Sequence, residues 1–124
     1  MPPRNWTVLV VEDDHDSIQM VSKILSHHGA KVQVAHNGRE CLESVEDVNP
    51  TLIVMDLAMP EMDGWETLVE LRANPSTAHI PVVAITAYDS GSVQEEAARV
   101  GFDAYFPKPL SATSFVDDLA RLVN

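Results

Sequence analysis

Hydrophobic residues occur along this chain in two alternating patterns, short continuous runs and stretches with helical spacing. The continuous runs are largely β-branched, which is typical of strands that are buried on both faces. They predict strands at residues 6–11, 31–35, 51–55, 80–85 and 104–106. Apolar residues between the strands recur every three or four positions, which predicts helices at residues 16–28, 37–49, 63–74, 92–100 and 111–123. Two of these helices are expected to begin with a side-chain cap and a glutamate three residues later, Asn37 with Glu40 and Asp63 with Glu66. The chain therefore alternates strand and helix five times.

Strands that alternate regularly with helices predict a parallel sheet with helices on both faces, because right-handed crossovers leave few other arrangements. We therefore expect an α/β protein of the flavodoxin-like class. This is a three-layer α/β/α fold with five helices and a five-stranded parallel sheet in the strand order 2-1-3-4-5. Residues 1–124 have room for a single domain. Ligands of such sheets bind beyond the carboxyl ends of the strands, and the functional residues are expected there.

The charge of the chain argues against two classes of partner. Eight Lys and Arg residues against 19 Asp and Glu residues give a formal net charge of −11, which repels nucleic acids and anionic membrane surfaces. No apolar run approaches the roughly 18 residues of a membrane span, and no signal peptide is recognisable, so we expect a cytoplasmic protein. The single cysteine, Cys41, falls among apolar residues of the second helix and is expected to be a buried, reduced thiol.

Polar residues that can carry chemistry stand at the ends of four expected strands. Glu12 and Asp13 follow the first strand, Asp56 the third, Thr86 the fourth and Lys108 the fifth. If the first and third strands are neighbours, three carboxylates meet in one cleft. Two carboxylates about 4 Å apart repel by about 4 kcal/mol at an effective dielectric of 20. A hard divalent cation removes this cost, and oxygen-only ligands favour Mg²⁺, or Mn²⁺, over Zn²⁺.

These groups together suit the transfer of a phosphoryl group. Asp56 lies centrally among them and is the natural oxygen nucleophile. Lys108 supplies a positive charge and Thr86 a hydroxyl donor, and with a bound cation they would neutralise the transferred group. The sequence thus nominates Asp56, Thr86 and Lys108 as the catalytic residues.

The same residues lie in four short motifs that resemble those of the receiver domain of two-component response regulators. The motifs are residues 10–13 (VVED), 55–64 (MDLAMPEMDG), 85–87 (ITA) and 108–109 (KP). They stand in the family's order at compatible spacing, and the resemblance covers essentially the whole chain. The chemotaxis receiver is the familiar single-domain example of this type.

The resemblance implies a phosphorylated aspartate in a phosphorelay. Asp56 would accept a phosphoryl group from the phosphohistidine of a sensor histidine kinase or of a histidine phosphotransfer protein, and Thr86 and Lys108 would hold the phosphoryl oxygens. The implied Mg²⁺ ligands are Asp13, Asp56, the carbonyl of Ala58 and, through water, Glu12. The chain would be a signalling phosphoprotein and not an enzyme for an external substrate, with only self-directed phosphotransfer and slow autodephosphorylation.

The resemblance also implies how phosphorylation is read. Tyr105 stands at the family's aromatic switch position and would turn inward when Thr86 is drawn toward the phosphorylated aspartate. This movement would change the surface presented to a downstream protein target. A cis peptide between Lys108 and Pro109 is frequent in the family. The chain would be a monomer or a phosphorylation-dependent dimer, and because no output segment follows Val123 it is expected to act through another protein.

Other functions share the fold or the acidic residues. A flavin carrier would need a Ser-, Thr- or Gly-rich phosphate loop where this chain has the acidic residues 12–14. An aspartate-nucleophile phosphohydrolase would place a second acid two residues after Asp56, where Ala58 stands. Two alternatives stay open: a pseudo-receiver that binds partners without phosphorylation, and a receiver cut from a hybrid histidine kinase.

Overall fold

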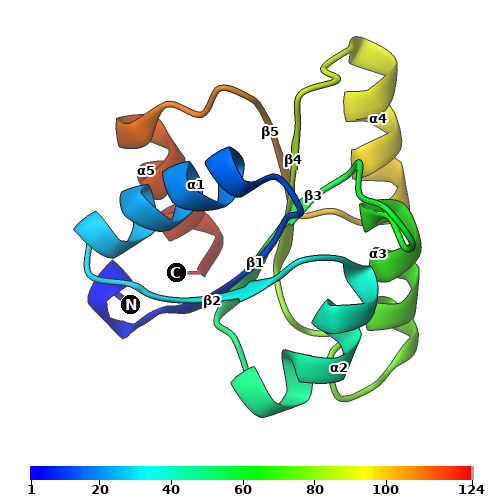
Figure 1. Cartoon of the computed structure of the whole chain (residues 1–124), viewed down its shortest axis with the longest axis horizontal. Coiled ribbons are helices and arrows are strands. Elements are labelled where there is room, and N and C mark those ends of the chain that lie inside the picture. Colours follow the sequence, from blue (N-terminus) through cyan, green and yellow to red (C-terminus); the bar gives the residue numbers. More distant parts are fainter. Residues whose placement is uncertain (124) are drawn as a thin grey trace.

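Five parallel strands form one sheet in the computed structural model, which describes residues 1–123 (Figure 1). The strands are β1 (Thr7–Val11), β2 (Lys31–Ala35), β3 (Leu52–Asp56), β4 (Val82–Thr86) and β5 (Ala104–Pro107). They lie in the order β2-β1-β3-β4-β5, and every neighbouring pair is parallel. The expected flavodoxin-like fold and its strand order are confirmed.

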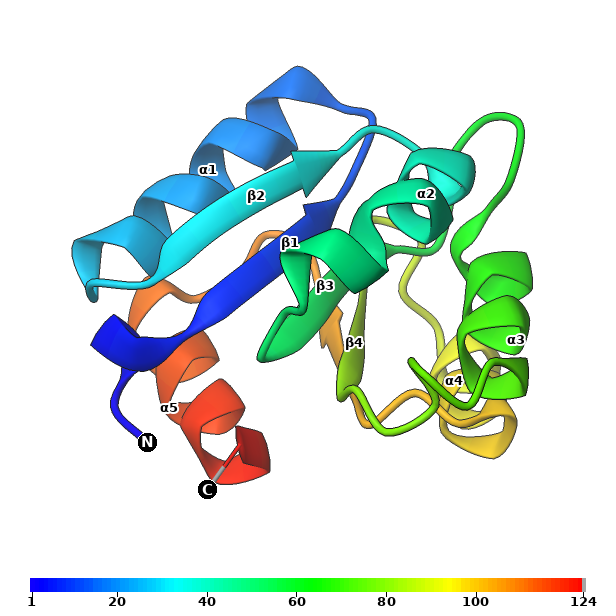
Figure 2. The same ribbon diagram turned by 90° about the horizontal axis from the view of Figure 1, so that it is seen from below.

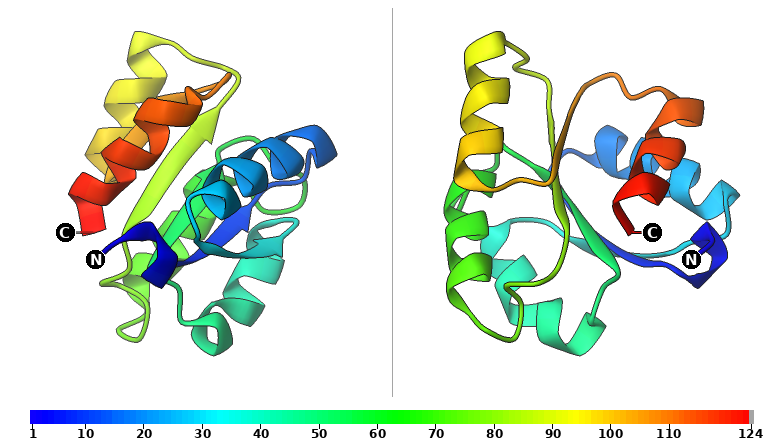
Figure 3. Two further views of the ribbon diagram at one scale, coloured as in Figure 1. Left: turned by 90° about the vertical axis from the view of Figure 1, so that its left-hand side faces the viewer. Right: turned by 180° about the vertical axis from the view of Figure 1, so that it is seen from behind.

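Two layers of helices enclose the sheet, as Figure 1 and Figure 2 show. The layer on one face contains α1 (His15–His27) and α5 (Ala112–Val123). The layer on the other face contains α2 (Gly38–Val48), α3 (Gly64–Ala73) and α4 (Gly91–Val100). Figure 3 shows the same division from two further directions. A short 3-10 helix, η1 (Pro3–Asn5), precedes β1, and within residues 1–123 no helix is both long and apolar enough to span a membrane.

The observed strand boundaries make two candidate functional residues, Asp56 and Thr86, the last residues of strands. The third strand covers Leu52–Asp56 and not residues 51–55, so Asp56 is its last residue and pairs with Ile85 of β4. The fourth strand begins at Val82, two residues later than expected, because Pro81 has no N–H to donate to a ladder. The backbone pairing of β3 with β4 therefore sets the position of Asp56, independently of its side-chain contacts.

Side-chain caps define the starts of two helices in the second layer. The Asp63 carboxylate accepts a hydrogen bond from the backbone N–H of Glu66, and the Glu66 carboxylate accepts one from the backbone N–H of Asp63. These two reciprocal bonds form the expected capping box at the start of α3. Asn37 caps α2 through the N–H of Glu40, also as expected. The second bond of a capping box, from the backbone N–H of Asn37 to the Glu40 carboxylate, is replaced by another. The Glu40 carboxylate instead accepts a hydrogen bond from the backbone N–H of His36 and also contacts the His36 ring.

Alternate residues of the central strands divide the core between the two faces of the sheet. In β1, Leu9 and Val11 belong to the cluster under α2, α3 and α4, whereas Val8 and Val10 belong to the cluster under α1 and α5. All four side chains are fully buried. Cys41 lies in the first cluster, and burial raises the pKa of its thiol to about 12. The expected buried thiol is confirmed.

Arg72 joins three separate segments at the amino-terminal end of the sheet. Its guanidinium donates hydrogen bonds to the carbonyls of Ala78 at 3.1 Å, Ile80 at 2.7 Å and Gly101 at 3.4 Å, and to the Asp103 carboxylate at 2.9 Å. The same Asp103 oxygen accepts from the first N–H of β4 at 2.8 Å. One side chain of α3 thus holds the entry to β4 and the connection between α4 and β5.

We expect Arg72→Ala to lower the free energy of unfolding by about 2 kcal/mol, because the substitution removes several hydrogen bonds of a charged donor. Urea unfolding would measure the loss. The control is Arg99→Ala, since Arg99 is exposed and pairs only with Glu96 three residues away on the same helix. This control is expected to change stability by less than about 0.5 kcal/mol. Equal losses in both variants would contradict the special position of Arg72.

Candidate functional site

The candidate residues meet in one cleft at the carboxyl ends of the strands. The cleft has a volume of about 260 Å³ and lies beyond the ends of β1 and β3. Its lining residues are Glu12, Asp13, Asp14, Ser17, Asp56, Ala58, Ala87, Tyr88 and Lys108. The predicted position of the site, at neighbouring strand ends of a parallel sheet, is therefore where the polar residues gather.

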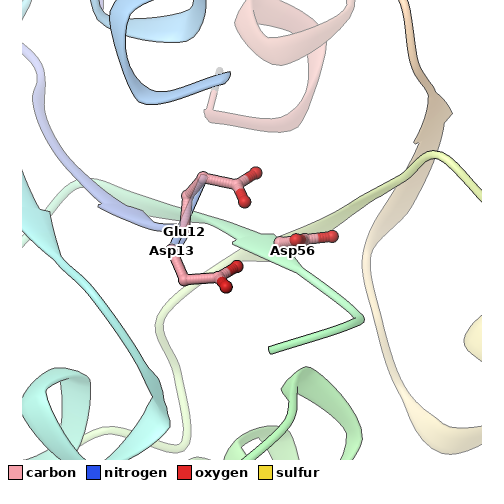
Figure 4. Close-up of side chains that lie close together, drawn as sticks. All are labelled: Glu12, Asp13 and Asp56. Carbon is pink, nitrogen blue, oxygen red and sulfur yellow. The ribbon is translucent and has the colours of Figure 1, made fainter. Parts of the chain in front are cut away.

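Three carboxylates form the centre of the cleft. One oxygen each from Glu12, Asp13 and Asp56 lies within 4.8 Å of the other two. Figure 4 shows the three carboxyl groups close together where β1 and β3 end. Glu12 is fully buried and Asp56 is 5% exposed, whereas Asp13 is exposed to solvent. Two of the three negative charges are thus shielded from water, which strengthens their repulsion.

The environment of Asp56 disfavours its charged form. Burial raises the pKa of Asp56 to about 7, and the neighbouring Glu12 carboxyl adds to the shift. The positive charge of Lys108 and the N–H of Ala58 act in the opposite direction without cancelling it. An ionised Asp56 therefore destabilises the folded protein in the absence of an additional cation.

Lys108 is the only cationic side chain among the residues that line the cleft. Its Nζ donates hydrogen bonds to Glu12 Oε2 at 2.7 Å and to Ser17 Oγ at 3.1 Å. Asp56 Oδ2 lies 3.8 Å from the same nitrogen, which is an ion pair but not a hydrogen bond. The peptide bond between Lys108 and Pro109 is cis, as the resemblance implied.

Of the two residues Ala58 and Thr86, only Ala58 lines the cleft. Ala58 lines it, and its N–H lies 3.4 Å from Asp56 Oδ1. Thr86 ends β4 but is buried and does not line the cleft, and its Oγ1 accepts a hydrogen bond from the N–H of Tyr88 at 3.0 Å. The role predicted for the Thr86 hydroxyl therefore requires a change of hydrogen-bond partner, and it stays a prediction.

Tyr105 lies in β5, at the edge of the sheet. Its hydroxyl donates a hydrogen bond of 2.7 Å to Asp89 Oδ1 in the connection between β4 and α4. Burial, together with this hydrogen bond, raises the pKa of Tyr105 to about 12, so the phenol keeps its proton. The predicted inward movement of Tyr105 would break the contact with Asp89, and this movement stays a prediction.

Sequence reasoning did not nominate two polar residues of the cleft, Asp14 and Ser17. Asp14 caps α1 by accepting a hydrogen bond from the N–H of Ser17 at 2.9 Å. Asp is a preferred residue directly before the first turn of a helix, so Asp14 could have been found. The contact of Ser17 with Lys108 joins residues 91 positions apart and leaves no local signal in the sequence.

The donors in the cleft fit a hard divalent cation. Those near Asp56 are carboxylate oxygens, and neither His nor Cys occurs among the lining residues. Such a set is suited to Mg²⁺, which prefers oxygen ligands and needs only one or two carboxylates. The carboxylates of Glu12, Asp13 and Asp56 are the residues that could hold such an ion.

Known proteins are similar to this chain in sequence and in fold. Residues 8–120 match the family model of the response regulator receiver domain. The polar-differentiation response regulator DivK of Brucella anthropi is 30% identical over 113 residues, which cover 91% of this chain and 92% of DivK. The chain spans about half the length of the MprA response regulators that it also matches, 50% in the protein from Mycobacterium ulcerans.

Solved structures agree with the sequence comparison. The chemotaxis protein CheY4 of Vibrio cholerae superposes with a TM-score of 0.85 at 30% identity, covering 93% of this chain and 96% of CheY4. The receiver domain of the sensor histidine kinase PA1611 from Pseudomonas aeruginosa superposes with a TM-score of 0.87 at 25% identity, covering 95% and 97%. That structure has a magnesium ion coordinated in its active-site cleft. The chain belongs to the response regulator receiver domain family.

Proposed function

We propose that this receiver domain accepts a phosphoryl group on Asp56 in the presence of Mg²⁺ and acts as a switch for protein interactions. The observation that carries the proposal is the position of Asp56 at the end of β3. One carboxylate oxygen each of Glu12 and Asp13 lies within 4.8 Å of an Asp56 oxygen, and the Lys108 ammonium lies 3.8 Å from Asp56 Oδ2. This arrangement presents a nucleophilic oxygen beside both a cation-binding set and a fixed positive charge.

The chemical step assigned to Asp56 is a displacement at phosphorus. A carboxylate oxygen of Asp56 attacks the phosphorus atom of a phosphohistidine, the P–N bond breaks as the P–O bond forms, and the imidazole leaves with the electron pair. Lys108 stabilises the negative charge of the transferred group. When bound, Mg²⁺ supplies further charge neutralisation and orientation. Thr86 would donate its hydroxyl to the product after leaving the N–H of Tyr88.

Three observations support Mg²⁺ as the cation, with Mn²⁺ as a chemically similar substitute. The proposed ligands are Asp13, Asp56 and the Ala58 carbonyl, with Glu12 assisting. Their donors are all oxygen, and three of them cluster around one point. The similar receiver domain of PA1611 holds magnesium in its own active-site cleft.

Two surfaces are proposed for partners. A sensor histidine kinase or a histidine phosphotransfer protein would supply the phosphoryl group near α1, where Met20 is 45% exposed beside a small apolar pocket. A downstream protein target would bind near Tyr105, because rearrangement of the contact with Asp89 changes the surface between β5 and α4. The oligomeric state, monomer or phosphorylation-dependent dimer, stays a prediction.

Acetyl phosphate with Mg²⁺ is expected to add one phosphoryl group to the wild-type chain, which intact-mass spectrometry would detect. Asp56→Asn is expected to abolish the adduct, because the amide is a poor nucleophile. Asp117→Asn, a substitution on the exposed face of α5, serves as the control and is expected to retain it. An adduct that persists in Asp56→Asn would refute the assignment, and no adduct in any variant would favour a pseudo-receiver.

Without Mg²⁺, Asp56→Asn is expected to be more stable than the wild type at about pH 8 and to lose this advantage on acidification. The folded-state pKa of about 7 lies above the ordinary value of 3.8, so the native state binds the proton more tightly. Wild-type stability therefore falls as pH rises from about 4 to about 7 and then levels off.

Thermal unfolding between about pH 4 and pH 8 would measure this difference, with Asp117→Asn as the charge-matched control. The melting temperature of Asp56→Asn relative to the wild type is expected to rise through this range. A difference that is constant with pH, or that shrinks as pH rises, would show that ionised Asp56 carries no such cost.

A further inference from the structure

Four residues from the end of β1, the start of α1 and the segment after β5 form a closed ring of hydrogen bonds beside the cleft. Lys108 Nζ donates to Glu12 Oε2 at 2.7 Å and to Ser17 Oγ at 3.1 Å. The backbone N–H of Asp14 donates to Glu12 Oε1 at 3.1 Å, and the N–H of Ser17 donates to Asp14 Oδ2 at 2.9 Å. The ring therefore joins the helix cap, the buried Glu12 and the Lys108 ammonium in one rigid unit.

This ring determines which way the ammonium of Lys108 faces. An ammonium has three N–H donors, and the bonds to Glu12 and Ser17 occupy two of them. Asp56 Oδ2 lies 3.8 Å from Nζ, too far for a direct hydrogen bond. The third donor is thus free for an oxygen of a phosphoryl group attached to Asp56, and the separation leaves room for that oxygen.

We propose that Ser17 is a positioning residue for phosphoryl transfer, a role that rests on the proposed phosphorylation of Asp56. Its hydroxyl holds the Lys108 ammonium away from the Asp56 carboxylate while directing the third N–H into the cleft. Without the hydroxyl, Glu12 alone holds the ammonium, which can then close onto the opposite charge of Asp56. The ammonium would occupy the space that the incoming phosphoryl oxygen requires.

A neutral hydroxyl is well suited to this position. A third carboxylate against Lys108 would add to the repulsion among Glu12, Asp13 and Asp56, whereas an apolar side chain would leave one ammonium donor without a partner. The Asp14 cap fixes the backbone of Ser17 in the first turn of α1, so the hydroxyl is presented from a rigid support. Ser17 therefore orients the cation without changing the charge of the site.

The test compares Ser17→Val with Ser17→Thr, two β-branched side chains of nearly equal shape, of which only threonine keeps the hydroxyl. Phosphorylation is followed with acetyl phosphate and Mg²⁺, because Ser17 also lines the pocket beside Met20 and a protein donor would mix docking with chemistry. Ser17→Val is expected to be phosphorylated about tenfold more slowly than the wild type. This change corresponds to a rise of about 1.4 kcal/mol in the activation free energy of phosphorylation. Ser17→Thr is expected to recover most of the rate.

Two further readouts separate positioning from a general disturbance of the fold. Nuclear magnetic resonance of the metal-free protein is expected to show faster exchange of the Lys108 ammonium hydrogens with water in Ser17→Val than in Ser17→Thr. The melting temperature is expected to be alike in the two variants, because valine and threonine fill nearly the same space at this half-buried position.

Equal phosphorylation rates in the valine and threonine variants would overturn the role of the Ser17 hydroxyl while leaving phosphorylation of Asp56 intact. A slower rate in Ser17→Val that comes with a lower melting temperature would also overturn it, because the fold around the site would then be disturbed. A wild-type chain that takes up no phosphoryl group would instead overturn the proposed function, and this inference with it.

Discussion

Repulsion among Glu12, Asp13 and Asp56 is the constraint on which the rest of the site depends. The parallel pairing of β1 with β3 brings the ends of both strands together, so their carboxylates cannot separate without breaking the sheet. Burial of Glu12 and Asp56 strengthens the repulsion, and one lysine offsets only part of it. A domain of this size has little net stability to lose, so the cluster is best understood as a binding site for positive charge.

The contacts that stabilise the fold and the residues of the candidate site lie at opposite ends of the same sheet. At the amino-terminal end, Arg72 meets carbonyls and the Asp103 carboxylate, and these charges and hydrogen bonds are satisfied. At the carboxyl end, Lys108 lies against more negative charge than it can neutralise. Fully buried strands connect the two ends and carry the core on both faces. The protein thus tolerates an unfavourable site because the remainder of the fold is well packed.

Much of this arrangement could be predicted from the sequence because it depends on local patterns. Buried strands appear as continuous apolar runs, and a parallel sheet brings residues at the ends of those runs together, which located Glu12, Asp13, Asp56 and Lys108. Contacts between distant segments could not be predicted in this way. Ser17 meets Lys108 only because the fold brings the start of α1 beside the segment after β5, and local motifs give no indication of that contact.

The environment of individual side chains also required the structure. The sequence places Thr86 at a strand end, where a hydroxyl is expected to enter the cleft, but the folded chain buries Thr86 and engages its oxygen with the N–H of Tyr88. Glu40 is likewise expected to complete a cap and instead contacts His36. In both cases competing hydrogen-bond partners lie within a few residues, and their geometry decides which bond forms.

Thermal unfolding of the metal-free wild type during a titration with Mg²⁺ tests the central claim most directly. A cation that binds the native carboxylate cluster stabilises it by about 2.7 kcal/mol at a hundredfold excess over Kd, so the melting temperature is expected to rise with Mg²⁺. Asp13→Asn is expected to melt higher than the wild type without the ion and to gain less from it, because one repelling charge and one ligand are lost together. A wild-type melting temperature that does not respond to millimolar Mg²⁺ would contradict the account.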